Sequence, residues 1–221
     1  VISKATGINL VAAATRIALG QRLRDLPYGI GLRPHVPFVV VKVPVFSFAK
    51  MRGVETILGP EMKSTGEVLG IDETFPGALR KAFEGAGIRM PRKGGRILVA
   101  LAPRAVEDRD LETLRRYVQL GYELLATPAT FPGLQASEIS AERTENAMDL
   151  VAARAVDLVI NTVTGTREAT DGYRMRRVAA EANIACITSI DTAAALAHAL
   201  EHPAGPPRSL QEYHELAKRI A

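Results

Sequence analysis

Hydrophobic residues after position 95 fall into short continuous runs that alternate with amphipathic stretches. Residues 97–101 form a continuous apolar run, which is typical of a strand buried on both faces of a parallel sheet, and further strands are predicted at 122–126, 157–161 and 184–187. Apolar residues at helical spacing predict helices over 110–120, 144–155, 171–183 and 192–200. This alternation predicts a small three-layer α/β domain with parallel strands and right-handed crossovers.

The first 92 residues have a more mixed pattern. Residues 39–43 predict a strand that Pro44 stops, because proline lacks the N–H donor. Residues 72–74 predict the start of a helix, whose apolar face is Ala78, Leu79, Ala82 and Phe83. So few elements can hardly close a core alone, so we expect an α+β remnant that packs on another part of a larger protein.

A change in composition near residue 92 predicts a domain boundary. Glycine and proline are dense at 85–87 and 91–95, as in a linker or a domain edge. Residues 1–92 carry a net charge of +6, whereas residues 93–221 carry −2. We therefore predict two units, 1–92 and 93–221. Residues 210–220 have helical spacing and are expected to dock on the same protein or on a neighbour.

Composition excludes several classes of protein. The chain has 221 residues, is 47% hydrophobic and 24% charged, and so has the make-up of one or two globular domains. Its net charge is +4, but the basic residues are scattered, aromatic residues are scarce and tryptophan is absent, which argues against nucleic acid as a partner. Cys186 is the single cysteine, which excludes an internal disulfide and a cysteine-built zinc site.

The first residues of the chain and the length of its apolar runs indicate where in the cell the protein is expected. No run approaches the length that spans a membrane, and the first residues do not resemble a signal peptide. We therefore expect a cytoplasmic protein with no membrane partner. The chain begins with Val1 rather than Met, which fits either an alternative start codon or a piece of something longer.

Small polar residues follow two of the predicted strands. Ligands of open parallel sheets bind beyond the carboxyl ends of the strands, and hydroxyls, an amide and backbone N–H groups can hold a phosphate there. The sequence thus predicts a phosphate or effector site made by Thr127, Thr130, Asn161, Thr162 and Thr164. The alternative is that they are ordinary turn and cap residues.

Three arginines in the next predicted helix have two interpretations. Arg174, Arg176 and Arg177 are most simply the solvated face of that helix. A phosphate-facing role is the less favoured interpretation.

Residues 58–70 read Leu-Gly-Pro-Glu-Met-Lys-Ser-Thr-Gly-Glu-Val-Leu-Gly. This motif closely resembles the end of the second ATP-grasp domain in the large subunits of carbamoyl-phosphate synthases. Residues 3–8, Ser-Lys-Ala-Thr-Gly-Ile, resemble the segment just upstream in that family. Residues 94–200 are similar to the family's C-terminal methylglyoxal-synthase-like domain, so the resemblance covers nearly the whole chain.

The resemblance implies a function. The family is a set of ligases that make carbamoyl phosphate for arginine or pyrimidine synthesis from bicarbonate, two ATP and ammonia. A glutaminase small subunit releases that ammonia from glutamine. The C-terminal domain binds nucleotide effectors such as UMP or IMP. Partners implied for this chain are the small subunit and the rest of the large subunit, and we expect an oligomer.

The carboxylates of residues 1–92 form no paired array that could hold Mg²⁺ or Mn²⁺ against ATP. The resemblance places the metal-binding carboxylate and Asn just upstream of this chain, so we expect no catalytic residue, metal or ATP site within it. The strongest candidates for a functional role are Glu61, Lys63 and Glu67. Lys63 and Glu67 are expected on the same side of a strand, but a structural role is favoured for all three. His35, with no second ligand nearby, is expected to be a loop residue.

The predicted effector site departs from the family pattern. Similar domains read Ala-Thr-x-Gly-Thr after the second strand, whereas residues 126–130 read Ala-Thr-Pro-Ala-Thr. Ala129 removes a glycine's access to positive φ, and Pro128 removes an N–H donor. Residues 130–144 contain no lysine, and Leu111 stands where some members have one. We therefore expect nucleotide regulation to be weak, altered or lost.

Two other functions stay open. Residues 94–200 could be a free-standing phosphate or nucleotide sensor, although a sensor has no use for the 58–70 motif. A lyase of the methylglyoxal-synthase type needs a carboxylate beside a phosphate site, and Asp171 is the one poised candidate. The altered phosphate loop disfavours the lyase.

Overall fold

The computed structural model describes residues 1–32, 35–46, 62–102, 106–162 and 171–220. Its largest unit is a parallel sheet of five strands in the order β5-β4-β3-β6-β7. The strands are β3 (Arg96–Ala100), β4 (Glu123–Ala126), β5 (Glu142–Arg143), β6 (Leu158–Asn161) and β7 (Ala185–Ile187). The first of these strands, β3, lies in the middle of the sheet. Strands β4 and β5 follow on one side of it, and β6 and β7 follow on the other side. The order therefore reverses between β3 and β6, as in doubly wound folds.

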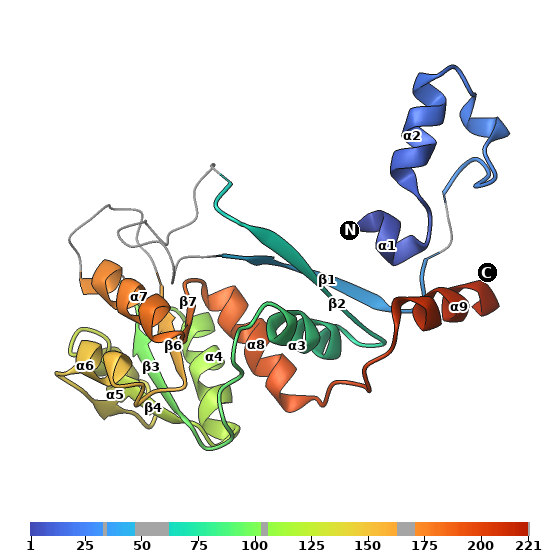
Figure 1. Ribbon diagram of the computed structural model, residues 1–221. Helices are drawn as coiled ribbons and strands as arrows, with labels where there is room; N and C mark the ends of the chain where they lie inside the picture. The colour runs from blue at the N-terminus through green and yellow to red at the C-terminus, as the bar shows by residue number, and fades with distance from the viewer. Residues whose placement is uncertain (33–34, 47–61, 103–105, 163–170, 221) are drawn as a thin grey trace.

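Helices cover both faces of this sheet (Figure 1). Ile97 and Val99 face a core shared with α4 (Asp108–Gln119) and α8 (Ile190–Glu201). Leu98 and Ala100 face a second core shared with α6 (Ala147–Ala152) and α7 (Asp171–Ala182). Burial on both faces explains why the strands read as continuous apolar runs, and the predicted three-layer α/β fold is confirmed.

Residues before 92 form a smaller α+β unit. Strands β1 (Val39–Val45) and β2 (Gly66–Asp72) are antiparallel, and α3 (Phe75–Gly85) packs on both. The prediction that Pro44 stops the strand is wrong, because Pro44 pairs opposite Glu67 within β1. A proline fits at the edge of a sheet, where its missing N–H costs no ladder bond. The predicted apolar face of the helix is confirmed, because Ala78, Leu79, Ala82 and Phe83 are buried.

Gly70 shows why β2 and α3 can lie so close together. A Cβ placed on Gly70 would lie 1.9 Å from the carbonyl oxygen of Ala78 and 2.4 Å from the backbone nitrogen of Ala82. No side chain fits there, so this close approach requires glycine.

The two units share one hydrophobic core. Helix α3 packs on α8, and Leu79 and Phe83 belong to the same buried cluster as Leu196. A chain boundary at about residue 92 stays a prediction.

The N-terminal residues form α1 (Ile2–Thr6), α2 (Leu10–Ala18) and the 3₁₀ turn η1 (Leu23–Asp25), and α2 stands away from the sheets (Figure 1). Helix α9 (Leu210–Ile220) contacts α1, and its Tyr213 is buried beside Phe38 with ring centroids 5.2 Å apart. The prediction that the C-terminal segment docks on the same protein is therefore confirmed.

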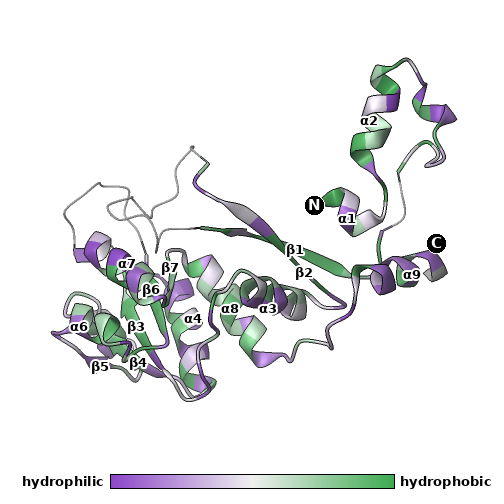
Figure 2. Ribbon diagram, in the orientation of Figure 1, coloured by the Kyte–Doolittle hydropathy of each residue, from purple (hydrophilic) through white to green (hydrophobic). Residues whose placement is uncertain are grey.

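Figure 2 shows that hydrophobic residues make up much of the α2 ribbon, and Leu10, Val11 and Ile17 of this helix are exposed. Among the described helices, none combines the length and the hydropathy required to cross a bilayer.

Candidate functional site at the carboxyl edge of the parallel sheet

The sheet has its topological switch point between β3 and β6. Immediately after these strands, the backbone N–H of Ala102 donates to Thr162 Oγ1 at 2.7 Å. The preceding N–H, that of Leu101, donates to Thr130 Oγ1 at 2.9 Å. Two threonines from different connections thus hold the segment that leaves β3 at the edge where doubly wound sheets bind ligands.

Thr127 and Thr130 lie together after β4. Thr127 Oγ1 donates to Thr130 Oγ1 at 3.0 Å, and the backbone N–H of Thr130 donates to the carbonyl of Thr127 at 2.9 Å. With bonds from Leu101 and Thr127, Thr130 Oγ1 uses both of its acceptor positions and keeps its own proton to donate. Thr130 occupies the N-cap position of the next helix, but its side chain makes no capping hydrogen bond, so both interpretations of these threonines stay open.

Asn161 is the last residue of β6 and is 3% exposed. Its Oδ1 accepts a hydrogen bond from Arg176 Nη1 at 2.7 Å. The Nδ2 group has a weak contact of 3.9 Å with Met175 Sδ. Because Arg176 occupies the oxygen, the amide presents its N–H donors, which is the polarity that suits an anion.

Arg176 is buried, with 5% of its surface exposed. The favoured interpretation of the three arginines as a solvated face is therefore wrong for this residue, and it holds for the exposed Arg174. Arg176 projects from α7 toward the sheet because it lies next to Met175, which is part of the buried face of that helix. Spacing alone offered no signal to separate Arg176 from its neighbours.

The charge of Arg176 is poorly compensated within the described residues. Its partner there is the neutral amide of Asn161, and its buried Nε has no hydrogen-bond partner. A buried cation without a paired anion is costly, and an incoming anion would remove that cost.

Arg176 also lines a cavity of about 470 Å³, together with Asn183, Cys186, Phe83 and Met90. Burial raises the pKa of the Cys186 thiol to about 12, although the nearby charge of Arg176 opposes this. The thiol stays protonated at neutral pH, so it is not a nucleophile. The cavity has room for a small ligand, but its described residues supply no activated nucleophile.

The structure places the other candidate residues as follows. Thr164 and Glu61 lie outside the described residues. Lys63 precedes β2, so it does not share a strand face with Glu67, and Glu67 pairs with Lys42 at 2.6 Å. Asp171 and His35 are exposed, as is Arg143, the one basic residue of the segment 130–144, whereas Leu111 is buried against the sheet.

Two elements of the site region were not predicted. Helix α5 (Phe131–Ala136) and strand β5 lie in a segment for which the sequence analysis predicted no element. Leu134 of α5 is fully buried, and β5 pairs in parallel with β4. The segment that lacks lysine is thus an ordered part of the sheet domain.

Comparison with known proteins agrees with this architecture. Residues 110–188 match the MGS-like domain family. The carbamoyl phosphate synthase large chain of Agathobacter rectalis is 46% identical over 213 residues, which cover 90% of this chain and 19% of that protein. The large chain of Lachnoclostridium phytofermentans is 42% identical over 221 residues, which cover 95% of this chain and 20% of that protein.

The predicted resemblance to the large subunit and the predicted fold class are both confirmed. The chain spans about a fifth of the length of these relatives.

Proposed function

We propose that this chain, whose similarity to carbamoyl phosphate synthase large chains covers nearly its whole length, is the carboxy-terminal part of such a subunit. It works with the rest of the large subunit and a glutaminase small subunit to make carbamoyl phosphate from bicarbonate, ATP and glutamine-derived ammonia. Residues 1–92 are the end of the second ATP-grasp domain, and residues 93–221 are the regulatory unit. ATP and its Mg²⁺ or Mn²⁺ belong to the rest of the enzyme, which acts in the cytoplasm.

Exposed apolar side chains on the N-terminal residues support this proposal. Most large apolar side chains that are exposed in the described residues lie before position 33, among them Val11, Leu19, Ile30 and Leu32. Exposed apolar side chains that are concentrated in one part of a chain are typical of an interaction site. We assign them to the contact with the rest of the ATP-grasp domain.

The regulatory site in this proposal is an anion site at the switch point, made by Thr127, Thr130, Asn161 and Thr162, with Arg176 behind them. Thr164, which the sequence also predicts for this site, lies outside the described residues. The observation that carries this site is the buried guanidinium of Arg176, which among the described residues has a neutral partner and an Nε without a hydrogen bond. The altered loop with Pro128 and Ala129 makes nucleotide binding weak.

Calorimetry on the 221-residue chain tests the anion site. We expect inorganic phosphate to bind with a dissociation constant of about 1 mM or weaker, and UMP and IMP to bind no tighter than about 0.1 mM. Arg176→Met removes the charge at similar volume and abolishes phosphate binding. Arg174→Met, a change at an exposed position on the same helix, leaves it intact.

Several results would contradict the regulatory site. Phosphate binding that survives in Arg176→Met, or no phosphate binding by the unaltered chain, overturns the role of Arg176. Micromolar binding of UMP or IMP overturns the weakened site.

An activity assay separates the competing functions. The purified chain is expected to form neither carbamoyl phosphate nor methylglyoxal, because the core ATP and metal ligands lie elsewhere in the large subunit. Production of methylglyoxal from a triose phosphate would favour the lyase instead. Phosphate binding without any association with the remainder of a large subunit would favour the sensor.

A further inference from the structure

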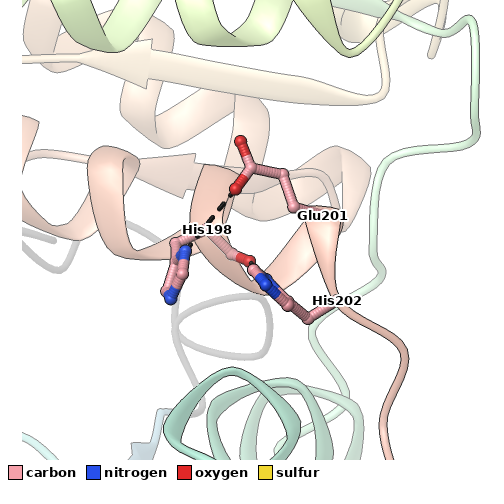
Figure 3. Close-up of side chains that lie close together, drawn as sticks. All are labelled: His198, Glu201 and His202. Carbon is pink, nitrogen blue, oxygen red and sulfur yellow. Dashed lines mark hydrogen bonds and ion pairs between the residues drawn. The ribbon is translucent and has the colours of Figure 1, made fainter.

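Three potential metal ligands lie together on the last turn of α8 and at its end. They are His198, Glu201 and His202, and one ligand atom of each lies within 4.8 Å of those of the other two. Residues three and four apart share one face of a helix, which explains why the three side chains meet. Figure 3 shows them side by side, with Glu201 turned toward His198, and their facing Nδ1 and Oε2 atoms are 3.5 Å apart.

Hydrogen bonds fix which ring nitrogen of each histidine carries a lone pair. The carbonyl oxygen of His198 lies 2.9 Å from His202 Nδ1, so Nδ1 carries the proton and Nε2 is free to accept. A backbone carbonyl that fixes the tautomer in this way is common for histidines that bind metals. Arg116 Nη2 lies 3.1 Å from His198 Nδ1, and since a guanidinium can only donate, Nδ1 carries the lone pair there.

One cation already faces these donors. Arg116 reaches across from α4 and binds both carboxylate oxygens of Glu201 as well as His198. The lone pairs are therefore oriented toward a positive charge before any metal binds.

The guanidinium of Arg116 is placed so that it can move away from Glu201 and His198. Its side chain is 38% exposed, and the carboxylate of Glu112, one turn earlier on α4, acts on its charge. A guanidinium that moves toward Glu112 keeps an ionic partner at the surface, where exchange costs little.

We propose that His198, Glu201 and His202 form a binding site for a divalent transition-metal ion such as Zn²⁺, which replaces the guanidinium of Arg116. Two imidazole nitrogens and one carboxylate oxygen are a ligand set that suits Zn²⁺, with a fourth position left for water. The site lies outside the proposed anion site and would fix the end of α8, from which the chain leaves toward α9.

Titration of the tag-free chain with Zn²⁺ against a chromophoric chelator tests the proposal. We expect the unaltered chain to bind Zn²⁺ in the presence of excess Mg²⁺, because Mg²⁺ prefers oxygen ligands. His202→Ala should lower the Zn²⁺ affinity at least about tenfold. Arg116→Gln should raise it about tenfold, because the competing cation is gone.

Matched variants separate this site from other surface groups. His35→Ala removes an exposed histidine far along the chain, and Arg115→Gln removes the arginine next to Arg116, so both should leave Zn²⁺ affinity unchanged. As a second measurement on the unaltered chain, the imidazole NMR signals of His198 and His202 should shift with Zn²⁺, and that of His35 should not.

Three outcomes overturn the proposal: unchanged affinity in His202→Ala, equal competition by Mg²⁺, or weaker binding in Arg116→Gln.

Discussion

Replacing Asp72 with asparagine tests whether one buried carboxylate holds the two units together. Asp72 ends β2 and is 5% exposed. It accepts hydrogen bonds from the backbone N–H groups of Thr74 at 3.3 Å and Gly205 at 3.0 Å, and it pairs with Lys81 at 2.8 Å. Lys81 also donates to the carbonyl of Pro206 at 3.0 Å, so the pair fastens the connection between α8 and α9 to β2 and α3.

The size of the effect follows from these partners. A hydrogen bond to a charged group contributes about 1.5–3 kcal/mol, and breaking a buried ion pair by removing one partner costs about 3–5 kcal/mol. Asparagine keeps one acceptor oxygen, and Lys81 keeps its bonds to the carbonyls of Ile71 and Pro206. We therefore expect Asp72→Asn to lower the free energy of unfolding by about 3 kcal/mol at pH 7.

The pH dependence gives a second, independent signature. Burial alone would raise the pKa of Asp72, but the hydrogen bonds from Lys81, Thr74 and Gly205 together lower it below its ordinary value. A lowered pKa stabilises the folded state above the unfolded pKa of about 4, and this contribution is lost as the pH falls through the folded pKa. The difference in the free energy of unfolding between the unaltered chain and Asp72→Asn should thus be constant near neutral pH and shrink below about pH 4.

Urea unfolding followed by circular dichroism at several pH values measures both signatures. Glu73→Gln is the matched control, because Glu73 is the next residue and its ion pair with Arg208 is exposed, so little change is expected. If Asp72→Asn lowers the free energy of unfolding by less than about 1 kcal/mol at pH 7, the structural role of the Asp72 carboxylate is refuted. A difference in the free energy of unfolding that does not depend on pH would refute it as well.

Two further substitutions test the packing. Gly70→Ala should lower the free energy of unfolding by about 3 kcal/mol in urea, because its Cβ would lie 1.9 Å from the carbonyl oxygen of Ala78. Gly66→Ala, in the same strand, has no atom within 4 Å and should be close to neutral, so equal effects would contradict the close approach. Tyr117→Phe removes the buried 2.7 Å hydrogen bond to the carbonyl of Ala193 and should cost about 1–2 kcal/mol by the same assay, and no loss would show that this bond is not needed.

The sequence predicted the parts of the fold whose signal is local. Strands β3, β4, β6 and β7 are rich in apolar residues, and helices α4, α7, α8 and α9 have apolar residues at helical spacing, so each lies within a few residues of its predicted range. Short elements with weak periodicity were missed. Strand β5 has two residues and α5 six, and both depend on neighbours that are distant in the sequence.

Some residues of the candidate anion site were likewise predicted from the sequence, and one was not. The ends of β4 and β6 were predicted, and with them Thr127, Thr130, Asn161 and Thr162, because parallel strands place their carboxyl ends along one edge. The orientation of Arg176 was not predicted. Three arginines within four positions carry the same charge and side chain, and only packing against the sheet decides which of them is buried.

The sequence by itself thus determined the elements, the α/β class and the similarity to a large subunit, because these depend on local periodicity and on a motif read along the chain. Tertiary structure alone decided which charges are buried and which residues meet. Asn161 joins Arg176, Asp72 joins Gly205, and Arg116 of one helix reaches His198 and Glu201 of another. The physical reason is that hydrogen bonds and desolvation act on atoms a few ångströms apart in space, whatever their separation along the chain.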